Sequence, residues 1–79
     1  NPFVSSINVQ ISTQKITRGS IMIYANDGRV VYKRIVELSQ GLSSIEINGL
    51  EKLAAGIYIL DINFGEEFRR TEKIIKEHK

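Results

Sequence analysis

Apolar and polar residues alternate along most of this chain, with the period of two that is typical of strands packed on one face. Every second residue from Ile7 to Ile11 is apolar, which predicts a first strand with one buried face. Thr17-Arg18-Gly19 then predicts the turn after that strand. Residues 21–24 are apolar throughout, so we expect a central strand that is covered on both sides.

Turn-forming residues divide the rest of the chain into further short strands. Asn26-Asp27-Gly28 tolerates the positive φ values of a tight hairpin, and Asn48-Gly49 predicts another reversal. Residues 50–55 have apolar side chains three apart, which favours about one helical turn at a corner between sheets, because Gly56 then stops it. The strands between these breaks are predicted at residues 29–38, 43–47, 58–64 and 68–76.

We therefore predict an all-β fold, a small antiparallel immunoglobulin-like β-sandwich of six or seven strands. On the last strand both Ile74 and Ile75 are apolar, so one face should meet the core while the other is partly exposed. An exposed edge of this kind can accept an added strand from a partner. The core between the two sheets is expected to contain Ile7, Val9, Ile21, Ile23, Ile45, Leu60 and Ile62.

Length and composition agree with one small domain. The chain has 79 residues, of which 42% are hydrophobic and 25% are charged, as in ordinary globular domains. No apolar run approaches the roughly 20 residues of a membrane-spanning helix, and the absence of cysteine excludes disulfides. Because the chain begins with Asn1 and no signal peptide follows, we expect residues 1–79 to be a single domain excised from a larger protein.

The net charge is small, but the basic residues are unevenly distributed. Eleven Lys and Arg against nine Asp and Glu leave a formal charge of +2, which is too little to indicate nucleic-acid binding. Basic residues gather near the end of the chain, at Arg69, Arg70, Lys73, Lys76 and Lys79. They either protect a solvated edge strand from aggregation or form a basic docking strip for an anionic partner.

Two glycines and a tyrosine stand out among the turn signals. Gly28 and Gly56 are most simply explained as positions where a side chain would clash. The spacing of Leu53, Gly56 and Tyr58 fits a tyrosine corner, in which a Tyr near the start of a late strand donates its hydroxyl hydrogen to upstream backbone. Asn1-Pro2-Phe3 is expected at the turn into the first strand.

Four stretches follow one another in a set order. They are Asn1-Pro2-Phe3, the hairpin of residues 24–31, Gly56-Ile57-Tyr58 and Lys73-Ile74-Ile75-Lys76. In this order the chain resembles the C-terminal sorting domain of type IX secretion cargo, over residues 1–76. The resemblance implies a C-terminal domain that directs an upstream cargo protein through an outer-membrane translocon. It implies translocon recognition at Lys73, Ile74, Ile75 and Lys76, and a structural role for Asn1, Pro2, Phe3, Gly28, Gly56 and Tyr58.

The same resemblance implies further partners and a route. In many members a sortase-like peptidase removes the domain, and the cargo is attached to lipopolysaccharide, so anionic lipopolysaccharide is an indirect partner. The protein would be exported, pass through the periplasm and end at the cell surface or outside the cell. The chain departs from the family pattern by continuing through Glu77-His78-Lys79, and the Tyr-Pro that usually precedes Asn1-Pro2-Phe3 is not in the sequence.

No feature of the sequence indicates an enzyme or a cofactor site. The single histidine, His78, is next to last in the chain, where no general base would be held near a nucleophile. Metal-ligand spacing, a phosphate-binding loop and a dinucleotide fingerprint are all absent from the sequence. We expect no catalysis, no cofactor, no metal and no nucleic-acid partner. The alternatives to a sorting signal are an immunoglobulin-like structural or adhesion module and an anion-binding module that uses the terminal basic residues.

Overall fold

The structure is a computed structural model that describes residues 2–78, and its regular elements within that range are all strands. The predicted all-β fold is therefore confirmed, with seven strands. In chain order they are β1 (Pro2–Phe3), β2 (Ile7–Thr13), β3 (Thr17–Ala25), β4 (Val30–Leu38), β5 (Gly41–Ile47), β6 (Gly56–Asn63) and β7 (Arg69–Lys76).

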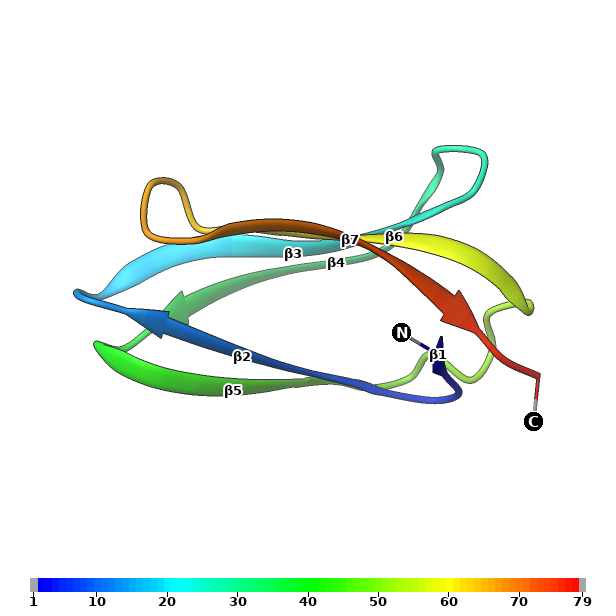
Figure 1. Ribbon diagram of the computed structural model, residues 1–79, viewed down its shortest axis with the longest axis horizontal. Helices are drawn as coiled ribbons and strands as arrows, with labels where there is room; N and C mark the ends of the chain where they lie inside the picture. Colours follow the sequence, from blue (N-terminus) through cyan, green and yellow to red (C-terminus); the bar gives the residue numbers. More distant parts are fainter. Residues whose placement is uncertain (1, 79) are drawn as a thin grey trace.

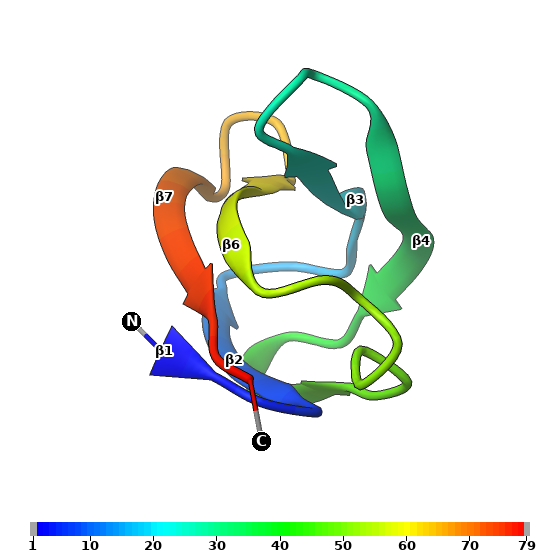
Figure 2. The same cartoon turned by 90° about the vertical axis from the view of Figure 1, so that its right-hand side faces the viewer.

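The strands form two sheets that pack face to face. One sheet has five strands in the order β1-β7-β6-β3-β4, and the other consists of β2 and β5. Neighbouring strands are antiparallel except β1 and β7, which are parallel. Figure 2 shows the two layers, with β6 and β3 in the middle of the larger one. The molecule is elongated, 38 × 22 × 17 Å, and the strands run along its long axis (Figure 1).

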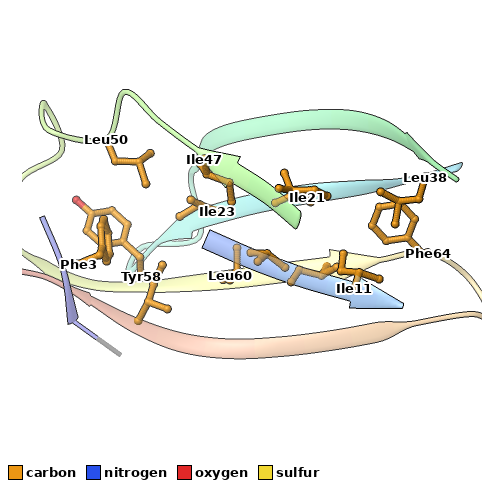
Figure 3. Packing of buried hydrophobic residues seen from close by; sticks show 14 residues of the cluster. Phe3, Ile11, Ile21, Ile23, Leu38, Ile47, Leu50, Tyr58, Leu60 and Phe64 are labelled. Carbon is orange, nitrogen blue, oxygen red and sulfur yellow. The ribbon is translucent and has the colours of Figure 1, made fainter. Parts of the chain in front are cut away.

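The core lies between the sheets and is built from every second residue of the strands. In β6, Tyr58, Leu60 and Ile62 are buried, while the residues between them are partly exposed. Six of the seven predicted core residues are buried, and the seventh, Ile7, is half-buried. Ile7 is more exposed because it lines a groove of about 320 Å³ between β2 and β7. Figure 3 shows Phe3 and Tyr58 at one end of this core.

The predicted turn at Thr17-Arg18-Gly19 is wrong, because these residues begin β3. The turn after β2 instead occupies residues 14–16. Gly19 lies within the strand, and a Cβ atom built there would run into the Phe64 ring and the Asn63 carbonyl oxygen. The glycine therefore permits a close approach between strands rather than a turn.

The segment before β6 is a corner between the sheets, as expected, but it contains no helix. The backbone N–H of Leu53 donates to the carbonyl oxygen of Leu50 at 3.1 Å, which closes a single turn. The side chain of Leu50 is buried, and its N–H donates to the carbonyl oxygen of Ser5 at 3.1 Å. These contacts fix the position from which β6 starts.

Side chains and backbone groups also join the two sheets. The guanidinium of Arg34 on β4 donates to the carbonyl oxygen of Glu46 on β5 at 3.2 Å. At the end far from β1, the hydroxyl of Thr13 donates to the carbonyl oxygen of Ser39 at 3.0 Å. The first bond links β4 to β5 across the sandwich, and the second ties the end of β2 to the connection between β4 and β5.

Candidate functional site at the motif end of the sandwich

Residues from all four sequence motifs lie at the same end of the molecule, on the right in Figure 1. In β1, Pro2 and Phe3 pair with Ile75 and Lys76 of β7. Gly56 at the start of β6 is the other cross-strand partner of Lys76. The β3–β4 hairpin, which contains Gly28, lies beside residues 55–58. We call this region the motif end; Asn1, the first residue of the first motif, lies outside the described residues.

Tyr58 forms the predicted tyrosine corner. Its hydroxyl donates to the carbonyl oxygen of Ala54 at 2.7 Å, and its side chain is buried. The Phe3 ring packs edge-on against it, with ring centroids 6.3 Å apart and an interplanar angle of 67°, which is a favourable aromatic arrangement. The corner therefore joins the beginning of the chain to the start of β6. Of the first motif, Phe3 belongs to the core, whereas Pro2 is exposed.

The two glycines of the motif end are explained by backbone conformation and not by a clash. Gly28 has a φ of 89° and Gly56 a φ of 152°, and no atom of the described residues lies within 4 Å of a Cβ atom built at either position. The prediction of a steric clash is therefore wrong at both sites. Residues with side chains rarely adopt such φ values. At Gly28 this conformation closes the hairpin, where its N–H donates to the carbonyl oxygen of Ala25 at 2.9 Å.

The Lys-Ile-Ile-Lys motif in β7 divides into two pairs of opposite orientation. Ile74 is 2% exposed and Lys76 is 5% exposed, whereas Ile75 is 43% exposed and Lys73 is also exposed. The alternative of a basic docking strip therefore does not hold for Lys76, which is buried and whose ammonium group donates to the carbonyl oxygen of Glu77 at 3.3 Å. Lys79, the last residue of that strip, lies outside the described residues.

Arg70 also does not fit the alternative of a basic docking strip. Its cross-strand partner is the buried Ile62, so it is on the inward-facing side of β7. Its guanidinium forms an ion pair with Glu72 at 2.6 Å. Among the described basic residues of the strip, Arg69 and Lys73 are the two on the outer face, because their partners Asn63 and Ile59 lie on that face of β6.

Lys73 stands in an apolar patch on the outer face of the five-stranded sheet. Cross-strand partners share a face, and Lys73 pairs with Ile59, which pairs in turn with Tyr24 of β3. Ile75 pairs with Ile57, and each is 43% exposed. We call these five residues (Tyr24, Ile57, Ile59, Lys73 and Ile75) the motif-end face. An exposed apolar patch with a polar residue beside it suits protein recognition.

The end of β7 is not a free edge, contrary to expectation. β1 covers it from Ile75 onward, and the N–H of Glu77 donates to the carbonyl oxygen of Phe3 at 2.8 Å. Addition of a partner strand at this point would have to displace β1. The accessible feature of the motif end is therefore its outer face and not its edge.

The described part of the chain offers neither a metal site nor a membrane helix. Among residues 2–78, no three His, Asp or Glu side chains come together in a way that could hold a metal ion. Over the same range there is no helix with the length and apolar character needed to cross a membrane.

Comparison with known families agrees with the arrangement of the motifs. The sequence model of the family described as secretion system C-terminal sorting domain matches residues 1–77. Comparison with curated proteins and with solved structures gives no match. The family match spans nearly the whole chain and includes all four motifs that meet at the motif end. The chain therefore belongs to the family of type IX secretion C-terminal sorting domains.

Proposed function

We propose that this domain is the sorting signal of a larger exported protein and that the outer-membrane type IX translocon binds it at the motif-end face. Membership of the family implies interaction with the type IX machinery and a protein that ends at the cell surface or outside the cell. The family is one of sorting signals and not of catalysts. The observation that carries the proposal is the convergence of the four motifs at one end of the sandwich.

The residues of the last motif have separate tasks in this proposal. Lys73 and Ile75 face outward and contact the translocon, whereas Ile74 and Lys76 face inward and hold β7 in position. The apolar area around Lys73 provides close contact, and its charge orients the approach of an acidic group on the translocon. Phe3 supports the motif-end face from the core side, through the contact of its ring with Tyr58.

The route and the processing of the cargo follow from the family and are part of the proposal. The protein passes through the periplasm, a sortase-like peptidase removes the domain, and the cargo is attached to lipopolysaccharide at the cell surface. Phe3 is buried and β1 is paired with β7, so a cut inside β1 would require local unfolding. We therefore place the cleaved bond at or before Asn1.

Lys73→Glu is expected to reduce surface delivery about tenfold, because it opposes an acidic partner group with a second negative charge. The assay uses a reporter that carries its own periplasmic export signal and is fused ahead of this chain, in a host with a working type IX system. Reporter on intact cells is measured by antibody labelling. Because Lys73 is exposed, the free energy of unfolding should change by no more than about 0.5 kcal/mol.

Lys15→Glu is the matched control for this substitution. Lys15 is exposed and lies in the turn between β2 and β3, at the end opposite the motif end (Figure 1). The change in charge is the same, but delivery should be unaffected. Equal delivery of the two variants, with both still folded, would remove Lys73 from the recognition surface.

A further inference from the structure

β4 is a free edge of the five-stranded sheet. Among the strands of residues 2–78 it pairs with β3 alone, and Figure 2 shows it at the margin of the molecule. Its pairing with β3 is regular from Leu38 back to Tyr32. A register shift follows before Tyr32, beyond which Val30 pairs with Tyr24. Half of the backbone N–H and C=O groups in residues 32–38 therefore point away from the sheet, as in any edge strand.

Three side chains of this edge share the outer face of the sheet. Lys33, Ile35 and Glu37 are all exposed, and Ile35 is 52% exposed. The ion pairs within residues 2–78 are Arg29 with Asp27 and Arg70 with Glu72, so neither Lys33 nor Glu37 is in an ion pair with a described residue. The strand thus presents a cation, an apolar residue and an anion at regular spacing, with the apolar residue in the centre.

We infer that β4 pairs antiparallel with β4 of a second copy of this chain, around a two-fold axis through Ile35. In this register Ile35 meets its own counterpart, and Lys33 of each copy lies opposite Glu37 of the other. Residues 32 and 38 are also opposite each other, so the pairing uses the whole regular part of the edge and ends at the register shift. Opposite charges and apolar residues that face each other across strands are stabilising.

Neighbouring registers of the same strand are less favourable. An axis through Lys33 or through Arg34 places two like charges directly opposite each other, which is destabilising. An axis through Val36 places Ile35 opposite Glu37 and pairs no opposite charges. Lysine on an edge strand usually prevents such pairing. Here Glu37, four residues further along the same face, provides an opposite charge for Lys33 of the second copy.

The pairing joins two five-stranded sheets into one continuous sheet. Because the two-fold axis runs perpendicular to the sheet, both motif-end faces lie on the same side of it. Arg34 does not obstruct this contact, since its guanidinium is turned across the sandwich to the carbonyl oxygen of Glu46. The dimer has an isologous interface, in which the same residues of both copies meet.

Charge-reversal variants of the 79-residue chain test the register. Sedimentation equilibrium from micromolar to millimolar concentration should show a dimer for the intact chain, and Lys33→Glu or Glu37→Lys alone should weaken it about tenfold or more. An equimolar mixture of the two variants should associate again, because position 33 of each then meets an opposite charge at position 37 of the other. Arg69→Glu, on the outer face of β7 at the other side of the sheet, should dimerise like the intact chain.

A second measurement requires no variant. Amide resonances of residues 32–38 in the intact chain should shift with concentration, while those of β7 should not. A chain that stays monomeric at millimolar concentration, single variants that associate as well as the intact chain, or a mixture that stays monomeric would each overturn the inference. These measurements use purified chain, so their outcome is independent of whether the domain directs secretion.

Discussion

Ile74→Ala should lower the free energy of unfolding by about 3 kcal/mol, whereas Ile75→Ala should lower it by less than about 1 kcal/mol. The two residues are neighbours of the same type, but Ile74 is 2% exposed and packs in the core, while Ile75 is 43% exposed on the outer face. Truncation of Ile74 removes core packing beside Tyr58, its cross-strand partner. Urea denaturation of the two variants measures both losses.

Equal losses for the two variants would contradict the orientation of β7 described above. The same contrast bears on secretion experiments. Deleting residues 73–79 would remove Ile74 from the core and also remove the part of β7 that pairs with β1. Failure of a truncated domain to be secreted would therefore report loss of the fold as much as loss of recognition, which is why a substitution at Lys73 is the sharper test.

Gly19→Ala should lower the free energy of unfolding by about 3 kcal/mol, at the upper end of the usual range for overpacking. The new methyl group would overlap the Phe64 ring and the carbonyl oxygen of Asn63. Phe64 is 1% exposed, so its ring has little room to move. Thermal denaturation followed by circular dichroism would measure the loss.

Gly28→Ala provides a control for this substitution. It also replaces a glycine, but its cost should be about 1–2 kcal/mol. Only the positive φ is unfavourable, because no atom of residues 2–78 lies within 4 Å of the added methyl group. Adding Phe64→Leu to Gly19→Ala should cost less than the sum of the two single changes, since the smaller side chain relieves the overlap. Strict additivity would show that the two residues do not contact each other.

Most of the fold follows from local pattern in the sequence. Alternating apolar residues place β2 and β6 and their buried faces correctly, because one face of each strand meets the core and the other meets solvent. The turn predicted at Gly19 fails because glycine has two structural uses, positive φ and close packing, which one sequence cannot separate. The parallel pairing of β1 with β7 joins opposite ends of the chain, and no local signal indicates it.

The sequence indicated which residues belong to the candidate site better than it indicated which of their side chains face outward. The same alternation that buries Ile74 also places Lys76 inside, although lysine in general favours the surface. Ile57 and Ile59 were missed as part of the outer face, yet they lie at alternate positions with Asp61 along β6. Polar residues of a strand mark its solvent-facing side. The alternation of Ile57 and Ile59 with Asp61 could therefore have placed both isoleucines on the outer face.

Surface delivery of a reporter is the most direct test of the sorting function. A reporter exported to the periplasm and fused ahead of this chain should reach the cell surface in a host with a type IX system, and should stay in the periplasm of the same host without its translocon. The surface fraction is measured by antibody labelling of intact cells, with total reporter measured after lysis. Equal surface fractions in the two hosts would contradict the account and favour a structural or adhesion module.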